Sequence, residues 1–393
     1  MCSDKQCANK TSRLLIVCRC RGSNQRLHTI IIQCFENVNR CGVTFKSRFH
    51  GVCGAGGGSK NNNKHQEPAY DKDQLKVGRA INIFTRLGYL SISMRVIPRN
   101  DSDHSWLFRE PTVDVFNNID HLATHTRRNI SKKPPLDGDF HMEFCDNARQ
   151  LLQAYFRDFA VDRLEKPWRA FTGSWNQDMI ARHMGINSSF VHGNHCYVLV
   201  RLSRFRESVK LEQLPKNVQL LDAVAREIAN LQVGNVSSVL QFIKQFGSHY
   251  ITSYVTGNSL YQVFVYERQV YRRIKDRLKS KGVAELSSTE LQNFFSPWYA
   301  QHMGQIRVAS GNRTVERWAN ANLRMTYYIF SYASLLKLHT DTGMLTYLND
   351  LLRNEALLQI SLRTLLPAFK DPKKRAWFHE VLDNYIKLWE VNM

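Results

Sequence analysis

The strand pattern from Tyr250 to Tyr266 is the feature that most constrains the fold of this chain. Gly257-Asn258 interrupts it, and a glycine inside so long a strand usually marks a bend or a bulge. A second pattern lies between Cys196 and Phe205. Its two faces carry Cys196, Val198, Val200 and Leu202 on one side, and Tyr197, Leu199 and Arg201 on the other. These segments predict long strands in an antiparallel sheet.

Helical periodicity surrounds the strand patterns. The first predicted helix is capped by Asp146 and has an apolar face from Leu151 to Phe159, and the next two are Leu220–Leu231 and Val239–Phe246, the latter ending at a left-handed Gly247. A fourth helix is predicted at Arg268–Lys281, and a fifth begins with the capping box Ser287-Ser288-Thr289-Glu290 and has Trp298 on its apolar face. The last predicted helix follows Asp371-Pro372. Leu90 to Val96 predicts a further strand, and Asn100 to Asp139 is expected to be mostly loop. The fold class is therefore predicted to be α+β.

Composition supports a folded, basic protein. Lys plus Arg number 54 against 34 Asp plus Glu, which gives a formal charge of +20, and 43% of the residues are hydrophobic. That hydrophobic content excludes a largely disordered chain. No run approaches the 18 apolar residues of a transmembrane helix, so we expect none. The folded domain is predicted to span residues 75 to 393.

The first 67 residues have a different composition. They contain Cys2, Cys7, Cys18, Cys20, Cys34, Cys41 and Cys53, but no second pair matches Cys18-Arg19-Cys20, so a zinc module is not expected. The stretch from Gly51 to Asn63 predicts a flexible linker, and Ser59-Lys60 has the wrong order for a phosphate loop. We interpret residues 1–67 as a disordered leader that is not the native start of the mature protein.

Features of export are present without a visible signal peptide. Glycosylation sequons begin at Asn100, Asn129, Asn187, Asn235 and Asn312. Cys145 and Cys196, the only cysteines after the leader, are expected to form a disulfide in an oxidising compartment. The apolar run from Leu14 to Cys18 is too short for a signal peptide. We expect a secreted glycoprotein whose signal peptide is not part of this N-terminus.

One short motif carries a family resemblance. Phe246-Gly247-Ser248-His249-Tyr250, followed six residues later by Gly257, resembles the signature of the membrane attack complex/perforin (MACPF) domain. That signature is an aromatic-Gly-Thr/Ser-His-aromatic run leading to paired glycines, and Asn258 stands here in place of the second glycine. The resemblance runs from about Val77 to the C-terminus. It implies a strongly bent four-stranded antiparallel sheet flanked by two helical clusters, with the signature at the bend and Asn258 able to adopt left-handed dihedrals.

Three further stretches are similar to an insect member of that family. They are Ile97-Pro98-Arg99-Asn100-Asp101, Trp106-Leu107-Phe108-Arg109-Glu110-Pro111 and Glu143-Phe144-Cys145-Asp146-Asn147. This resemblance implies a secreted, non-enzymatic signalling protein that enables localised activation of a receptor tyrosine kinase in embryonic terminal patterning. The implied partners are an extracellular or eggshell-associated protein or a receptor-ligand system.

Pore formation is the alternative that the family resemblance leaves open. In pore-forming members the two helical clusters unwind into membrane hairpins. The segment Tyr271–Lys281 alternates poorly and carries charge in both registers, and each Lys or Arg on the lipid face would cost about 2–4 kcal/mol. The other cluster, Phe171–Phe190, is short and contains Asp178, Arg182 and His183. The sequence therefore favours a protein that does not open membranes.

The predicted basic helix has its own functional hypothesis. Its cationic side chains are Arg268, Arg272, Arg273, Lys275, Arg277, Lys279 and Lys281, which suit an anionic membrane surface or an extracellular polyanion. A solvated helix face is the other interpretation. Apart from Tyr271 the helix lacks aromatic residues between its charges, so we do not expect nucleic-acid binding. An intracellular basic binding protein is a third alternative for the whole chain.

No catalytic, metal or cofactor site is expected. His121-Leu122-Ala123-Thr124-His125 has the spacing of paired zinc ligands but lacks the glutamate of a metalloprotease helix. His192, His195 and Cys196 are interpreted as a loop that leads into a strand. His249 is expected to form hydrogen bonds within the bend rather than act as a base. The chain also lacks a Gly-x-Ser-x-Gly nucleophile motif.

Overall fold

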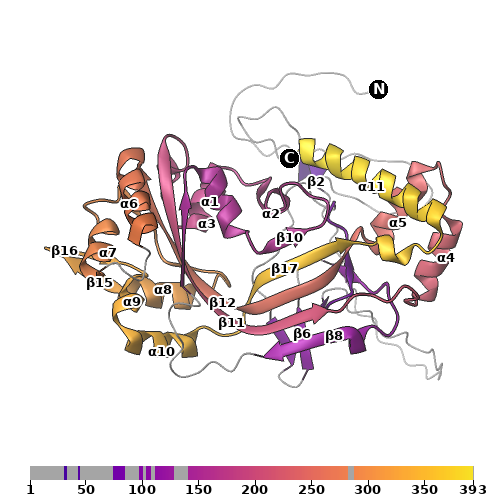
Figure 1. Cartoon of the computed structure of the whole chain (residues 1–393), viewed down its shortest axis with the longest axis horizontal. Helices are drawn as coiled ribbons and strands as arrows, with labels where there is room; N and C mark the ends of the chain where they lie inside the picture. Colours follow the sequence, from indigo (N-terminus) through magenta and orange to yellow (C-terminus); the bar gives the residue numbers. More distant parts are fainter. Residues whose placement is uncertain are drawn as a thin grey trace. The chain divides into compact units, whose positions relative to one another are not determined.

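The structure is a computed structural model that divides into two units, Met1–Ala69 and Tyr70–Met393 (Figure 1). It describes residues 31–32, 43–44, 74–84, 97–100, 103–107, 111–127, 140–281 and 287–392. In the first unit β1 (Ile31–Ile32) pairs antiparallel with β2 (Val43–Thr44). The predicted strand from Leu90 to Val96 lies outside the described residues. All further description concerns the second unit.

Three long antiparallel strands form the centre of the second unit. They are β11 (His195–Leu211), β12 (His249–Glu267) and β17 (Ala356–Thr364), in the order β17-β12-β11. On the far side of β11, β9 (Phe140–Cys145) pairs with its first half and β8 (Ala123–Arg127) with its second half. The long antiparallel part thus has four strand positions, which confirms the predicted α+β class with a central antiparallel sheet. The predicted bend stays a prediction.

Shorter strands extend this sheet or form small sheets beside it. In the central sheet they are β4 (Ala80–Ile81), β7 (Thr112–Val113), β10 (Phe159–Val161), β13 (His302–Met303) and β14 (Arg307–Val308). Outside it are β3 (Gln74–Leu75), β5 (Ile97–Asn100) and β6 (Asp103–Leu107) in one sheet, and β15 (Arg324–Tyr327) with β16 (Phe330–Ala333) in a hairpin. The segment expected to be mostly loop therefore contains strands. Unlike its neighbours, β10 runs parallel to β17.

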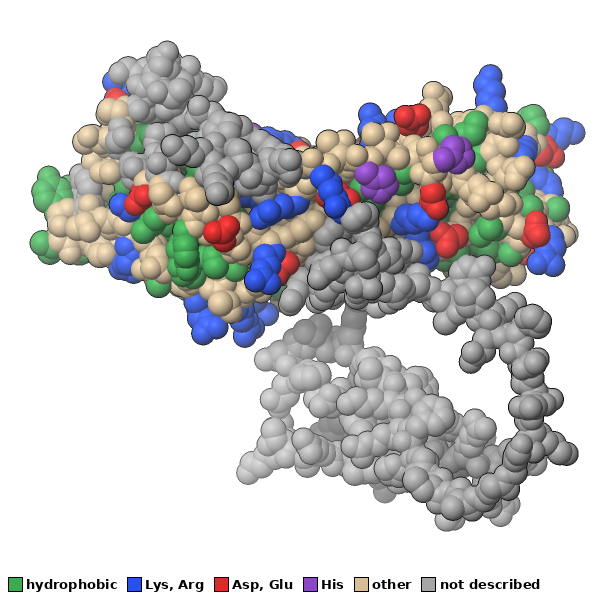
Figure 2. Space-filling model, turned by 90° about the horizontal axis from the view of Figure 1, so that it is seen from below, with side chains coloured by type: hydrophobic (Ala, Val, Ile, Leu, Met, Phe, Trp, Pro, Cys, Tyr) green, Lys and Arg blue, Asp and Glu red, His purple; other side chains and the backbone are tan. Residues whose placement is uncertain are grey.

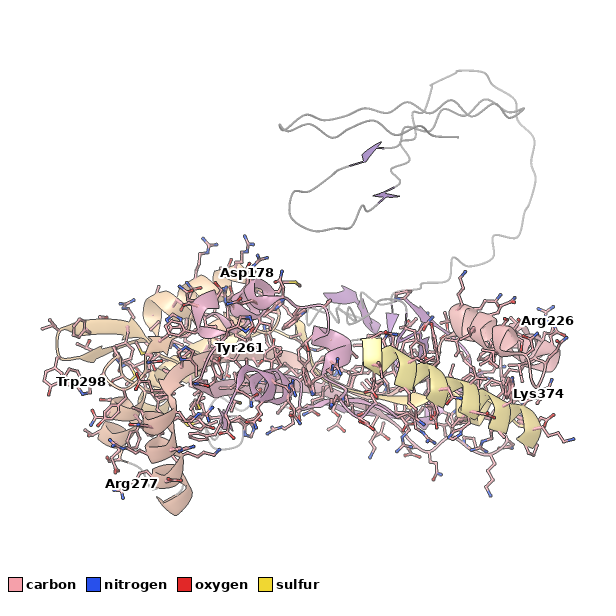
Figure 3. The ribbon with its side chains drawn as sticks, turned by 90° about the horizontal axis from the view of Figure 1, so that it is seen from above. Asp178, Arg226, Tyr261, Arg277, Trp298 and Lys374 are labelled. Carbon is pink, nitrogen blue, oxygen red and sulfur yellow. The ribbon has the colours of Figure 1, made fainter. Side chains whose placement is uncertain are left out.

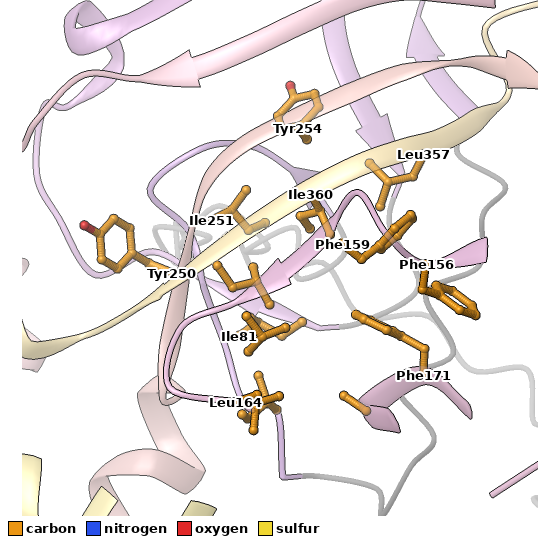
Figure 4. Packing of buried hydrophobic residues seen from close by; sticks show 14 of the residues in the cluster. Ile81, Phe156, Phe159, Leu164, Phe171, Tyr250, Ile251, Tyr254, Leu357 and Ile360 are labelled. Atoms are coloured by element: carbon orange, nitrogen blue, oxygen red, sulfur yellow. The ribbon is translucent and has the colours of Figure 1, made fainter. Parts of the chain in front are cut away.

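The central sheet is buried on both faces. Core 1 includes Tyr197 and Leu199 of β11, while core 2 includes Cys196, Val198, Val200 and Leu202 of the same strand. This division confirms the two faces expected from the sequence. Figure 4 shows part of core 1, where Phe156, Phe159 and Phe171 pack near Ile360. Phe156 and Phe171 stack with ring centroids 5.2 Å apart.

Each helix covers one of the two cores. Core 1 is covered by α1 (Ala148–Tyr155), α2 (Arg169–Thr172), α3 (Gln177–Met184), α4 (Asp222–Asn230), α5 (Val236–Phe246) and α11 (Pro372–Asn392). Core 2 is covered by α6 (Arg268–Lys281), α7 (Ser288–Phe294), α8 (Arg313–Asn322), α9 (Lys337–Thr340) and α10 (Thr342–Leu351). Figure 1 shows α6 to α10 gathered at one end of the sheet and α4, α5 and α11 at the other.

The helices of core 2 belong to one insertion between neighbouring strands. We call residues 268–355, which connect β12 to β17, the insert. The sequence correctly predicts its first helix and the capping box, in which the Ser287 and Glu290 side chains each accept from the other's backbone N–H. Trp298 does not continue the apolar face of α7, because the helix ends at Phe294 and Trp298 is 79% exposed.

The first predicted helix also differs from the structure at both ends. Asn147, not Asp146, is the N-cap, since its side chain accepts from the Gln150 N–H at 2.9 Å. The helix ends at Tyr155, and Phe159 begins β10. The apolar spacing of that segment suits a helix, but pairing with β17 determines the local structure of its last residues.

Candidate functional site

The signature begins where α5 ends and β12 starts. Gly247 follows Phe246 with φ +88° and ψ 176°, a conformation that only glycine adopts readily. The φ of Gly247 is positive, as predicted, but its φ and ψ together lie outside the left-handed helical region. A Cβ on Gly247 would approach the Ile81 carbonyl carbon and oxygen to 2.8 Å. Glycine is therefore required here both by the dihedral angles and by the close contact with β4.

His249 is fully buried and uses both ring nitrogens. Nε2 lies 3.0 Å from the Asp162 carbonyl oxygen, and Nδ1 lies 2.9 Å from the Ser248 Oγ. A carbonyl only accepts, so Nε2 carries the proton and Nδ1 accepts from the Ser248 hydroxyl. The Ser248 Oγ in turn accepts from the Ile83 N–H at 3.3 Å. These bonds connect β12 to the turn after β10 and to the segment after β4.

The environment keeps His249 neutral. Burial lowers its pKa to about 4, against an ordinary value of 6.5, and the Asp162 carbonyl only partly opposes that effect. A base that is protonated only near pH 4 and has no solvent access is unsuited to general acid–base work. The structure thus gives His249 a structural role.

Asp162 extends the same network to β17. Its carboxylate accepts from the Thr364 N–H at 3.3 Å and from the Thr364 hydroxyl at 3.2 Å. Thr364 is also the register partner of His249 in the β12–β17 pair. The signature therefore lies at a junction of β4, β10, β12 and β17. We call the linked residues Asp162, Ser248, His249 and Thr364 the signature junction.

Gly257 is needed for a close approach between strands. A Cβ there would lie 2.0 Å from the Arg204 carbonyl oxygen, and neither Gly257 nor Asn258 adopts a positive φ. The left-handed dihedrals that Asn258 could adopt are therefore not used here. Register shifts lie beside Gly257 on both sides, at Arg206 in β11 and at Leu358 in β17. Bulges of this kind increase the local twist of a sheet.

Asn258 makes contacts that a second glycine could not. Its side chain is fully buried, and its Oδ1 accepts from the Ser310 N–H at 3.3 Å while its Nδ2 bonds to the Ser310 Oγ at 3.1 Å. The residue that departs from the family signature thus fastens β12 to the insert.

Three more polar side chains of the sheet bond to the insert. Gln262, which is fully buried, donates to the Gly304 and Ala333 carbonyls at 2.7 and 3.0 Å and accepts from the Leu335 N–H at 2.8 Å. Arg204 donates to the Asn349 Oδ1 at 2.6 Å. Arg206 donates to the Asn349 and Leu352 carbonyls at 2.9 and 2.6 Å.

Sequence reasoning missed this group of contacts. Asn258 and Gln262 are polar residues within the Tyr250–Tyr266 strand pattern, and Arg204 and Arg206 lie at the end of the Cys196–Phe205 pattern. Such interruptions are the one signal that could have identified them, because a buried polar side chain needs a partner. We call these four side chains the insert clamp. Burial lowers the pKa of Arg206 from its ordinary value.

The predicted disulfide is absent. Cys145 and Cys196 are both free thiols and both buried. Cys145 pairs with Tyr197 across β9 and β11, so Cys196, one residue earlier, points to the opposite face of the sheet. Cys145 accordingly lies in core 1 and Cys196 in core 2. Burial, reinforced by Glu143 and Asp146, raises the pKa of Cys145 to about 12, and burial also raises that of Cys196.

The basic helix α6 is amphipathic as predicted. Tyr271, Ile274 and Leu278 face core 2, whereas Arg268, Arg272 and Arg273 are exposed. Two other predicted residues form ion pairs within the fold, Lys275 with Asp146 at 3.0 Å and Arg277 with Glu290 at 3.1 Å. The side chains of Lys279 and Lys281 lie outside the described residues. Among the described side chains, the candidate anionic-surface site is thus reduced to the first three arginines.

The described sequons differ in their surroundings. Asn187 and Asn235 are exposed, and Asn312 is partly buried. The Asn312 Oδ1 caps α8, and its Nδ2 lies 3.3 Å from the Glu355 carboxylate. A glycan on Asn312 would replace one of the two Nδ2 hydrogens beside that carboxylate. Glycosylation stays a prediction at all five positions; the Asn100 side chain and Asn129 lie outside the described residues.

The histidine pairs do not gather into a site. His121 is in a 3₁₀ turn, and His125 is in β8 with its Nδ1 3.8 Å from the Glu207 carboxylate. His195 packs on Phe190, while the Cys196 thiol points into core 2. Within the described ranges no three His, Cys, Asp or Glu side chains are placed to hold a metal. The same ranges contain no helix long and apolar enough to cross a bilayer.

Comparison with known proteins finds structural likeness only. No family model matches the chain, and no curated protein matches its sequence. It is similar in structure to GNIP1Aa from Chromobacterium piscinae, with a TM-score of 0.42 and 10% identity. It is also similar to a putative cell invasion protein with a MAC/Perforin domain from Bacteroides thetaiotaomicron, with a TM-score of 0.40 and 10% identity. Astrotactin-2, a vertebrate-specific perforin-like membrane protein, matches with a TM-score of 0.33 and 12% identity.

The extent of these matches differs between the three structures. They cover 79%, 78% and 75% of this chain, respectively. The chain spans 55% and 59% of the length of the first two structures and 98% of the astrotactin-2 chain.

Proposed function

We propose that this chain is a secreted, non-enzymatic perforin-like signalling protein. The observation that carries the proposal is the signature itself, in which Gly247, Gly257 and the neutral His249 each meet a structural requirement of the sheet. Residues that serve the junction in this way are not available for catalysis. The charged surface of α6 argues against a membrane hairpin, which supports signalling over pore formation.

The finer proposal concerns the signalling system. The three stretches beginning at Ile97, Trp106 and Glu143 resemble Torso-like, the insect protein. By that resemblance the chain would enable localised activation of the receptor tyrosine kinase Torso by its ligand in embryonic terminal patterning. Its partners would be an extracellular or eggshell-associated protein, or the receptor-ligand system itself.

Receptor phosphorylation in cultured cells tests this function. Cells that display Torso would receive its ligand with or without the purified full chain, and receptor tyrosine phosphorylation would be measured. We expect phosphorylation to rise when the chain accompanies the ligand. Equal phosphorylation with and without the chain would contradict the signalling proposal.

Attachment through α6 is a separate part of the proposal. Arg268, Arg272 and Arg273 would hold the protein on an anionic extracellular surface, and salt would weaken that attachment. Replacing all three by Gln should lower the salt concentration that elutes the chain from immobilised heparin. The matched control replaces Arg226, Lys373 and Arg375 on α4 and α11, which removes the same charge at the other end of the fold. Equal shifts for both variants would show that net charge, not α6, sets retention.

A membrane-perturbing, pore-forming effector is the second candidate. The observation in its favour is that the insert packs in a core of its own on one face of the sheet. Release of dye from lipid vesicles by the wild-type chain, with no effect on receptor phosphorylation, would favour this candidate over the first.

A further inference from the structure

A hairpin in the insert presents large apolar side chains to solvent. β15 and β16 are joined by the two-residue turn Tyr328-Ile329. Tyr328 is 83% exposed, Ile329 88% and Phe330 59%. We call these three residues the hairpin tip. A soluble protein rarely exposes three such residues in succession, so the tip calls for a functional explanation.

The turn itself has an unfavourable sequence. Tyr328 has φ +54°, and two-residue hairpin turns with a positive φ normally contain Asn, Asp or Gly. A bulky aromatic residue in that position is strained. Neither the turn geometry nor burial accounts for these residues. The exposed side chains themselves are then the feature to be explained.

The base of the hairpin is firmly held. Met325 and Tyr332 are buried in core 2, and the Ser334 N–H donates to the Leu323 carbonyl at 2.8 Å. Gln262 bonds to the Ala333 carbonyl and to the Leu335 N–H from the central sheet. The tip is thus presented on a fixed support.

A second exposed aromatic residue lies at the same end of the fold. Trp298 follows α7 and is 79% exposed. Figure 3 shows Trp298 at the end that holds β15 and β16, and Figure 2 shows hydrophobic side chains exposed at that end. Two apolar anchors on separate loops suit a broad surface better than a narrow protein groove.

The charges that flank the hairpin in the sequence favour an anionic surface. From Arg313 to Lys337 the chain has four basic residues, Arg313, Arg317, Arg324 and Lys337, and one acidic residue, Glu316. Glu316 is already paired with Arg307 at 3.1 Å. Arg324 lies along the hairpin, donating to the Ser331 carbonyl at 2.7 Å and to its Oγ at 2.9 Å. Aromatic side chains with cationic neighbours are typical of segments that insert at the headgroup level of a bilayer.

We propose that the hairpin tip, with Trp298, docks the protein peripherally on an anionic lipid bilayer. Tyr328, Ile329 and Phe330 would enter the interface, and the arginines before them would contact the headgroups. This surface is separate from the arginines of α6, and the proposal does not depend on the signalling role. Docking of this kind requires no unwinding of the insert and opens no pore.

Vesicle cosedimentation of the full chain tests the proposal. The probes are vesicles of phosphatidylcholine alone and of phosphatidylcholine mixed with phosphatidylserine, each loaded with dye. The wild-type chain should bind the mixed vesicles more strongly and release no dye. The double variant Tyr328→Gly with Ile329→Asn suits a two-residue turn whose first residue alone has a positive φ, so it should fold as well as the wild type while binding falls roughly tenfold or more. The variant Trp298→Ser should show a smaller loss.

A matched control separates the tip from general surface apolarity. Leu388 on α11 is 62% exposed and lies on a core 1 helix outside the insert, so Leu388→Gln should leave vesicle binding unchanged. The proposal is overturned if the wild-type chain fails to bind the mixed vesicles at low salt, if the turn variant binds as well as the wild type, or if Leu388→Gln loses as much binding. Dye release by the wild-type chain would contradict peripheral docking and indicate membrane insertion instead.

Discussion

Helices α4, α5 and α11 of core 1 and the insert of core 2 are held to the rest of the fold differently. Helix α5 packs through aromatic rings, as where Phe242 lies 5.2 Å from Phe369 and 5.9 Å from Phe378 of α11. Lys374 of α11 further donates to the carbonyls of Ile228 and Ala229 at the end of α4. In core 2 the insert clamp adds directed hydrogen bonds from the sheet to the backbone and side chains of the insert.

This difference concerns how each region would open. Apolar packing spreads its stabilisation over many contacts, so no single side chain decides it. A buried polar side chain with several partners is different, because removing it leaves every partner unsatisfied at once. We therefore expect loss of one clamp side chain to open the insert from the sheet, whereas no single loss should free α4, α5 and α11 from core 1; four substitutions or conditions bear on this account.

The largest effect is expected at the signature. Gly247→Ala should lower the free energy of unfolding by about 4 kcal/mol, since strain at a positive φ is joined by a clash with the Ile81 backbone. Gly234→Ala is the matched control, because Gly234 also has φ +88° but no atom lies within 4 Å of the point that its new methyl group would occupy. The control should cost about 1 kcal/mol in denaturant unfolding. Equal losses would mean that the contact with β4 is unimportant.

Gln262→Leu should produce the next largest effect. It leaves the Gly304 and Ala333 carbonyls and the Leu335 N–H without their partner, at a cost of about 3 kcal/mol. Gln241→Leu on the exposed face of α5 should change the free energy of unfolding by less than about 0.5 kcal/mol. A Gln262→Leu protein as stable as the control would show that the Gln262 bonds of the insert clamp do not stabilise the fold.

The signature junction predicts a specific pH dependence. The pKa of His249 is about 4 in the folded protein and 6.5 when the side chain is exposed. Between pH 6.5 and 4, His249 is therefore protonated in the unfolded chain but neutral in the folded protein. Stability is therefore full above pH 6.5 and falls by up to about 3 kcal/mol as the pH drops to 4. His183 and His302, whose pKa values burial also lowers, contribute in the same direction. The His249→Gln variant should lose less stability over this interval than the wild type; the same loss in both would show that His249 is not the responsible group.

The thiols should have the smallest effect. Cys145 and Cys196 point to opposite faces, so reductant should change the free energy of unfolding of a chain lacking residues 1–67 by less than about 0.5 kcal/mol, whereas loss of a disulfide would cost about 2–4 kcal/mol. Mass spectrometry after denaturation and alkylation without reductant should find both cysteines alkylated. A peptide pair linked through these two residues would contradict the structure.

The sequence predicts the elements better than their contacts. The two faces of β11, the amphipathic α6 and the capping box at Ser287 follow from local periodicity and capping, which depend on neighbours in the chain. The register between β9 and β11 cannot be predicted from local periodicity. That register determines that Cys145 faces away from Cys196. The partners of Gln262 and the Asp162 partner of His249 lie far away in the sequence, so periodicity could not reveal them. The apolar type of Trp298 predicts a place on a buried helix face, although the end of α7 places it in solvent.

Hydrogen exchange, read segment by segment, tests most directly whether the two regions open separately. In the Gln262→Leu variant of the full chain, the backbone amides of α7 to α10 and of the β15–β16 hairpin should exchange faster than in the wild type. Those of α5, α11 and the first residues of β12 should keep their protection. The account predicts this division at the central sheet. A uniform increase across both cores would contradict it, since the insert would then be held no differently from the rest of the fold.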